Sequence, residues 1–126
     1  MAHILIVDDD TQVREMLRQM LEDAGFEVTE APDGKVAMKL YLESPSDMVL
    51  TDLIMPEQEG LETIQSLKAE FPDAKIIAMS GGGRLGPESY LKMASAFGVL
   101  HTFTKPVRRN ELLEKIREVL GLEKEE

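Results

Sequence analysis

The stretch Met48-Val49-Leu50-Thr51-Asp52-Leu53-Ile54-Met55-Pro56 carries the strongest structural signal in the chain. Its first residues form a continuous apolar run, which is typical of a strand buried on both faces of a parallel sheet. Asp52 follows this run, and Pro56 turns the chain shortly afterwards. We therefore expect a strand over 48–51 that leads to Asp52. That carboxylate would lie at the edge where open α/β sheets bind their ligands.

Length and composition limit the class of protein. The 126 residues suit one domain, and a hydrophobic content of 43% is enough for a core. The chain has no cysteine, which excludes disulfides and thiolate zinc sites. The formal net charge of −10 argues against direct binding of nucleic acid, because a phosphate backbone needs a basic surface. The apolar run near the first residue is too short for a signal peptide or a membrane span, so we expect a cytoplasmic protein.

Apolar runs alternate with helical patterns along the whole chain. The sequence predicts strands over 3–7, 26–30, 48–51, 75–79 and 99–104. Gly25, Gly98 and Gly121 end three of the helical patterns. Five strand–helix units predict a doubly wound α/β fold, with a five-stranded parallel sheet of order 2-1-3-4-5 and helices on both faces. We expect this domain over residues 1–121, followed over 122–126 by an acidic tail or the start of a linker.

Polar residues stand where four of the predicted strands end. Asp8 and Asp9 follow the first strand, Asp52 the third, Ser80 the fourth and Lys105 the fifth. Because the carboxyl ends of parallel strands share one edge of the sheet, these side chains should converge on one pocket. An alternative interpretation is that the aspartates only cap helices.

Clustered carboxylates repel one another, which favours a bound cation. Mg²⁺ prefers oxygen ligands, keeps several waters, and is usually held by one or two carboxylates together with phosphate oxygens. We expect Asp9 and Asp52 to be direct ligands and Asp8 to act through water. A backbone carbonyl in the following loop, that of Ile54, would complete the protein's share of the ligands.

This set of groups suits phosphoryl transfer to a carboxylate. A carboxylate can attack a phosphoryl group and form an acyl phosphate. Catalysis of such a transfer is mostly positioning and stabilisation of negative charge, for which Mg²⁺ and Lys105 supply positive contacts. Ser80 offers a hydroxyl donor to a phosphoryl oxygen. The sequence therefore predicts Asp52 as the phosphoacceptor.

Four short motifs resemble those of the receiver domain of two-component response regulators, the CheY-like family with its flavodoxin-like fold. They are the acidic pair in Ile-Val-Asp-Asp at 6–9, the phosphoacceptor loop at 51–56 with Gly60, Ser80-Gly81, and Lys105-Pro106. Each motif is weak alone, but their order at the predicted strand ends is specific. The resemblance extends to about Leu120, and in this family the Lys-Pro bond is typically cis.

The resemblance implies a phosphorylation-dependent signalling switch. A histidine kinase or histidine phosphotransfer protein would donate the phosphoryl group to Asp52. The chain would catalyse only its own phosphotransfer and autodephosphorylation. The helix before Gly98, the strand over 99–104 and the last helix would form the surface that binds a downstream effector or a second copy of the chain.

The chain departs from the family at one switching position. The family has an aromatic residue three positions before the lysine, where this sequence has Thr102. Phe103 is the next residue, and it should point to the opposite face of the sheet. The sequence therefore predicts a weakened coupling between Ser80 and an aromatic side chain. The alternative is that the loop over 81–86 changes conformation when the switch is made.

Two other functions compete with the signalling switch. Asp8-x-Asp10-Thr11 faintly resembles the signature of haloacid-dehalogenase phosphatases, but that signature would place its threonine at Gln12. A pseudo-receiver that only binds a partner is disfavoured by the intact acidic pair, Asp52 and Lys105.

The glycine-rich loop over 81–86 also matches G-x-G-x-x-G. A dinucleotide site would need an acidic residue about twenty positions further on, and 100–105 contains none. His3 and His101 lack ligand partners at suitable spacing, so we expect structural or surface roles for both.

Overall fold

The computed structural model describes residues 2–52, 59–80 and 98–122. Within these ranges the strands are β1 (His3–Val7), β2 (Glu27–Ala31), β3 (Met48–Asp52), β4 (Ile76–Ser80) and β5 (His101–Thr104). The helices are α1 (Thr11–Asp23), α2 (Gly34–Glu43), α3 (Glu59–Glu70) and α5 (Arg109–Leu120). The helix expected before Gly98 lies outside the described residues.

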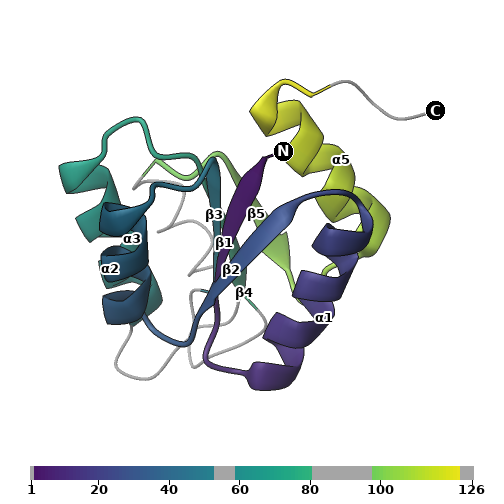
Figure 1. Cartoon of the computed structure of the whole chain (residues 1–126), viewed down its shortest axis with the longest axis horizontal. Helices are drawn as coiled ribbons and strands as arrows, with labels where there is room; N and C mark the ends of the chain where they lie inside the picture. Colours follow the sequence, from purple (N-terminus) through teal and green to yellow (C-terminus); the bar gives the residue numbers. More distant parts are fainter. Residues whose placement is uncertain (1, 53–58, 81–97, 123–126) are drawn as a thin grey trace.

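The five strands form one parallel sheet of order β2-β1-β3-β4-β5, as the sequence predicts. Figure 1 shows α1 and α5 on one side of this sheet and α2 and α3 on the other. The order reverses between β1 and β3, which are neighbours. Their carboxyl ends therefore form the switch point where ligands bind in this class of fold.

Three strands begin later than predicted, and β3 extends one residue further, to Asp52. β2 and β4 each begin one residue later than expected, and β5 begins at His101. The Phe26 amide donates to the Leu21 carbonyl of α1 instead of entering the ladder, so β2 starts at Glu27. Val99 packs against the core before its strand begins, which extends the apolar run beyond the paired residues. Because β4 is shifted by one residue, Ser80 is its last residue and does not follow the strand as predicted.

Capping residues that can be recognised in the sequence mark the start of α1 and the end of α5. Asp10 accepts hydrogen bonds from the amides of Gln12 and Val13 and caps the start of α1. Gly121 follows α5 with φ of +71°, a left-handed conformation that glycine adopts without a side-chain clash.

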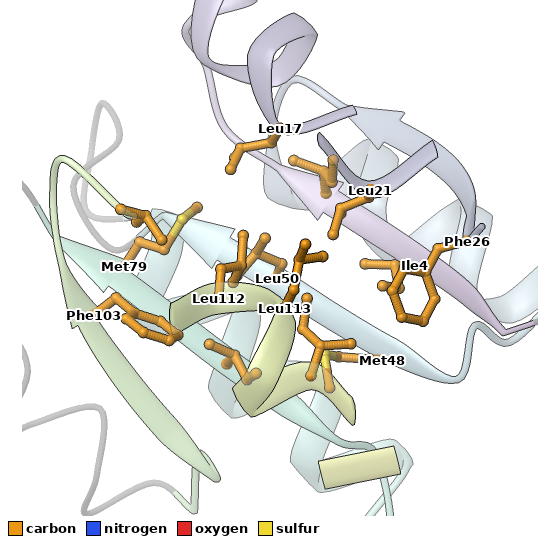
Figure 2. Packing of buried hydrophobic residues seen from close by; sticks show 14 residues of the cluster. Ile4, Leu17, Leu21, Phe26, Met48, Leu50, Met79, Phe103, Leu112 and Leu113 are labelled. Atoms are coloured by element: carbon orange, nitrogen blue, oxygen red, sulfur yellow. The ribbon is translucent and has the colours of Figure 1, made fainter. Parts of the chain in front are cut away.

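Each face of the sheet covers its own apolar cluster. Figure 2 shows the cluster between the sheet and the helices α1 and α5, which includes Leu17, Leu50 and Leu112. The other cluster lies towards α2 and α3 and includes Val49 and Ala78. Successive strand residues alternate between the two faces. Asp52 is thus expected on the same face as Leu50, towards α1 and α5.

Among the described residues, no helix is both long and apolar enough to span a membrane.

Candidate functional site

Three aspartates gather at the carboxyl ends of β1 and β3. One carboxylate oxygen each from Asp8, Asp9 and Asp52 lies within 4.8 Å of the other two. Asp8 is 0% exposed and Asp52 is 3% exposed, whereas Asp9 is exposed. A buried carboxylate whose charge is not compensated is costly, so we expect cations or hydrogen-bond donors close to these aspartates. The sequence predicted this grouping.

The loop between β1 and α1 is held by its own aspartates. Asp8 Oδ1 accepts a hydrogen bond from the Asp10 amide at 2.9 Å. Asp10 in turn caps α1 through its own carboxylate. The capping interpretation therefore fits Asp10, while Asp8 and Asp9 contribute carboxylates to the cluster.

Lys105 brings a positive charge to the cluster from the far end of the sequence. Its Nζ lies 2.8 Å from Asp8 Oδ2 and 3.4 Å from Asp52 Oδ2. Its amide donates to the Ser80 carbonyl at 2.9 Å, which extends the pairing of β5 with β4 up to this residue. The peptide bond between Lys105 and Pro106 is cis, as the resemblance implied. In this structure the shorter contact is with Asp8.

Burial alone would lower the pKa of Lys105. The hydrogen bond to Asp8 and the negative charges of Asp52 and Asp8 outweigh it, so the pKa lies above its ordinary value. The lysine is therefore a permanent cation at the site at neutral pH.

Ser80 places a hydroxyl at the end of β4. The residue is 0% exposed. Its Oγ is the single buried side-chain polar atom without a hydrogen-bond partner in the part of the chain that the structure describes. A buried donor left unpaired costs about 1–3 kcal/mol. Such an orphaned hydroxyl suits a site that receives an additional acceptor, for example a phosphoryl oxygen.

Several predicted residues lie outside the cluster or outside the described residues. Ile54 and the loop over 81–86 fall in ranges that the structure does not describe. Phe103 packs in the apolar cluster towards α5, as expected (Figure 2). Thr102 pairs with Ala78 and so lies on the opposite face. The aromatic side chain of β5 therefore packs away from the face that the family's switching residue uses.

The two histidines take structural positions, as expected. His3 shares a hydrogen bond between Nε2 and the Thr29 hydroxyl. The His101 ring packs edge-on against Phe103, with ring centroids 4.7 Å apart.

Sequence reasoning did not single out Arg14. Its Nη1 donates to the carbonyl oxygen of Asp8 at 2.6 Å. The signal in the sequence is a basic residue just inside the helix that follows the acidic pair. Spacing alone does not show that its side chain folds back onto β1.

The cluster has the chemistry of a magnesium site. All three donors are carboxylate oxygens, which a hard cation prefers. The exposed Asp9 leaves one side of the cluster accessible to water, and Mg²⁺ keeps several waters. The residues present therefore fit this ion.

A doubly wound parallel sheet with an acidic cluster and a lysine at its switch point is the architecture of CheY-like signalling proteins. The sequence matches the family described as response regulator receiver domain over residues 4–117. The chain therefore belongs to the receiver domains of two-component response regulators. This family generally comprises signalling phosphoacceptors rather than metabolic enzymes, and its members bind Mg²⁺ at the aspartate cluster.

Relatives of known function and structure agree with this assignment. The chain is 36% identical over 123 residues to the chemotaxis protein CheY of Bacillus subtilis, covering 96% of this chain and 100% of that one. It is 35% identical over 117 residues to CheY of Listeria monocytogenes, covering 92% and 96%. The solved structure of the response regulator TrrA from Thermotoga maritima, in complex with Mg²⁺-BeF, is similar with a TM-score of 0.83. It is 30% identical in sequence, and the match covers 94% of this chain and 99% of that one.

Proposed function

We propose that Asp52 is the phosphoacceptor of this receiver domain, and that a sensor histidine kinase or a histidine phosphotransfer protein is the donor. The observation that carries the proposal is the convergence of groups on Asp52. Its carboxylate lies 3.4 Å from the Lys105 ammonium and within 4.8 Å of ligand oxygens of Asp8 and Asp9. Asp8 accepts hydrogen bonds from the Asp10 amide and from the Lys105 ammonium.

In the proposed step, a carboxylate oxygen of Asp52 attacks the phosphorus of a phosphohistidine. The new P–O bond forms as the P–N bond breaks, and the imidazole leaves with the electron pair and takes up a proton. Negative charge accumulates on the phosphoryl oxygens during transfer. Lys105 is placed to neutralise part of that charge, and the Ser80 hydroxyl supplies a hydrogen bond to one of these oxygens.

We propose that Mg²⁺ is held by Asp9 and Asp52 directly and by Asp8 through water, with the Ile54 carbonyl as a further ligand. When bound, the ion supplies the positive charge that brings phosphoryl oxygens and carboxylates together. The mixed cluster of two buried carboxylates and one exposed carboxylate supports this assignment.

The phosphoacceptor is tested by incubating the chain with Mg²⁺ and a small phosphodonor, acetyl phosphate, and mapping the modified residue by mass spectrometry. We expect a single phosphoryl group on Asp52 and none on the D52N variant. Label on Asp8 would instead support the dehalogenase-like phosphatase. A chain that takes no label, and that does not respond to Mg²⁺ with beryllofluoride, would support the pseudo-receiver.

We further propose that the output surface includes the hollow between β5 and α5. This hollow has a volume of about 240 Å³, and it is lined by His101, Phe103, Glu111, Glu114, Lys115 and Glu118. Three carboxylates against one ammonium make this surface acidic, so it favours a partner with basic side chains. The helix before Gly98, which the resemblance adds to this surface, lies outside the described residues.

The output is tested by measuring association with and without Mg²⁺ and beryllofluoride, using light scattering after size exclusion. A shift from monomer to dimer supports a second copy as the partner. A chain that stays monomeric points to a different protein as the effector.

We also propose that the receiver unit covers residues 1–121 and acts in the cytoplasm.

A further inference from the structure

The guanidinium of Arg14 joins the loop after β1 to strand β2. Its Nη1 donates to the Asp8 carbonyl at 2.6 Å, and its Nε lies 3.3 Å from the Glu30 carboxylate. The Arg14 side chain is 14% exposed and that of Glu30 is 23% exposed. Arg18 also reaches Glu30, at 2.8 Å, but its side chain is 45% exposed. The two arginines therefore share a carboxylate, while Arg14 is the one bonded to the Asp8 carbonyl.

The carbonyl that Arg14 binds belongs to the peptide between the two members of the acidic pair. A peptide group is planar, so a hydrogen bond that fixes its oxygen also fixes the rotation of the whole plane. That rotation sets the direction in which the chain leaves Asp8 and hence where the Asp9 carboxylate points. The Asp8 side chain is held separately, by the Asp10 amide and Lys105.

We propose that Arg14 is a positioning residue for the magnesium site, which orients the Asp8–Asp9 peptide so that the Asp9 carboxylate faces Asp52. The inference rests on the magnesium site proposed above. The contact is short and charge-assisted, and the Glu30 carboxylate holds the guanidinium on its other side. Hydrogen bonds behind the ligands of a metal commonly set its affinity in this way.

Charge and geometry predict opposite effects of removing Arg14. A guanidinium near the cluster repels a second cation, so a purely electrostatic role predicts tighter Mg²⁺ binding once the charge is gone. A positioning role predicts weaker binding, because the Asp9 carboxylate loses its fixed direction. The sign of the change therefore separates the two roles.

The test compares Arg14→Gln with Arg18→Gln, which removes the same charge and a contact to the same carboxylate but leaves the Asp8 carbonyl bonded. The dissociation constant for Mg²⁺ is measured from backbone amide shifts in NMR titrations of the full chain. We expect R14Q to weaken binding about tenfold, at the lower end of the usual effect of such supporting contacts. R18Q should leave the affinity unchanged or slightly tighter.

Two further measurements separate positioning from general damage. Without Mg²⁺, the Asp9 amide should shift in R14Q and not in R18Q, because only R14Q frees the peptide. Arg14→Lys keeps a charged donor but loses the planar set of guanidinium N–H groups. It should therefore bind Mg²⁺ more tightly than R14Q and more weakly than the wild type. If R14Q does not fold, R14K carries the test and must bind Mg²⁺ more weakly than the wild type.

An R14Q variant that binds Mg²⁺ as tightly as the wild type, or more tightly, would overturn the inference and leave the magnesium site intact. A wild-type chain whose Asp9 and Asp52 amides show no saturable response to Mg²⁺ would overturn the proposed site itself, and the inference with it.

Discussion

Lys105 provides the most direct test of how the site balances its charges. Its ammonium lies 2.8 Å from one carboxylate and 3.4 Å from another, and the side chains of those two aspartates are 0% and 5% exposed. Lys105→Met keeps the length of the side chain and removes the charge. Two buried carboxylates are then left without this cation.

The expected cost follows from burial. Removing one partner from a fully buried ion pair costs about 3–5 kcal/mol, because the other charge stays buried without compensation. The Lys105 side chain is 22% exposed, so water screens part of the interaction. We therefore expect K105M to lower the free energy of unfolding by about 2–3 kcal/mol in the absence of Mg²⁺.

Urea unfolding followed by far-ultraviolet circular dichroism measures this, since the chain has no tryptophan. The matched control is Lys115→Met. Lys115 pairs with Glu118 at 3.1 Å, but those side chains are 26% and 66% exposed. Exposed pairs contribute less than about 1 kcal/mol, so K115M should have little effect.

Magnesium supplies the second arm of the experiment. Mg²⁺ bound by the aspartates replaces the lost counter-charge, so K105M should bind the ion more tightly than the wild type. A ligand that binds only the folded state stabilises it by about 2.7 kcal/mol at one hundred times its dissociation constant. Saturating Mg²⁺ should therefore reduce the difference in the free energy of unfolding between K105M and the wild type. The reasoning fails if, with Mg²⁺ removed by a chelator, K105M lowers the free energy of unfolding no more than K115M does. It also fails if Mg²⁺ leaves the difference in stability between K105M and the wild type unchanged.

Alkaline pH tests the same ion pair without Mg²⁺. Burial opposes the charge on Lys105, but Asp8 and Asp52 raise its pKa above the ordinary value. An unfolded lysine titrates near pH ~10.4. The stability that the wild type has over K105M should be fully present below that pH and decline as the pH rises through the higher folded-state pKa. A decline that begins at neutral pH would contradict the assignment.

Three smaller predictions test other positions. Ser80→Ala removes a buried hydroxyl that has no described partner, so it should leave stability unchanged or raise it by about 1 kcal/mol in urea unfolding, while slowing phosphorylation by acetyl phosphate. Burial, and then the charge of Lys115, lower the pKa of His101, whereas the charge of Glu118 raises it. The NMR titration midpoint of His101 should therefore lie below 6.5, and K115M should raise that midpoint. Gly121→Ala forces a side chain into a left-handed conformation at φ of +71° and should cost about 1 kcal/mol in the same unfolding assay. The first prediction fails if Ser80→Ala lowers stability or leaves the rate of phosphorylation unchanged. The second fails if the His101 midpoint does not lie below 6.5 or does not rise in K115M, and the third fails if Gly121→Ala does not lower stability.

The sequence alone determined the order of the elements and the groups at the strand ends. The continuous run before Asp52 predicted a strand buried on both faces, and β3 is buried along its whole length. Alternation predicted that Phe103 faces away from the switching position, and it packs towards α5. These features are local, because they depend on residue spacing and on which faces of a strand are apolar.

The tertiary structure decided which of these groups touch. Lys105 lies closer to Asp8 than to Asp52, although 97 residues separate it from Asp8 in sequence. The bond from Arg14 to the Asp8 carbonyl likewise depends on how α1 lies against the end of β1. Distances of this kind are set by the twist of the sheet, the docking of helices on it and the side-chain rotamers that packing allows. Sequence periodicity determines which face a residue occupies, and only the folded chain determines which atoms are in contact there.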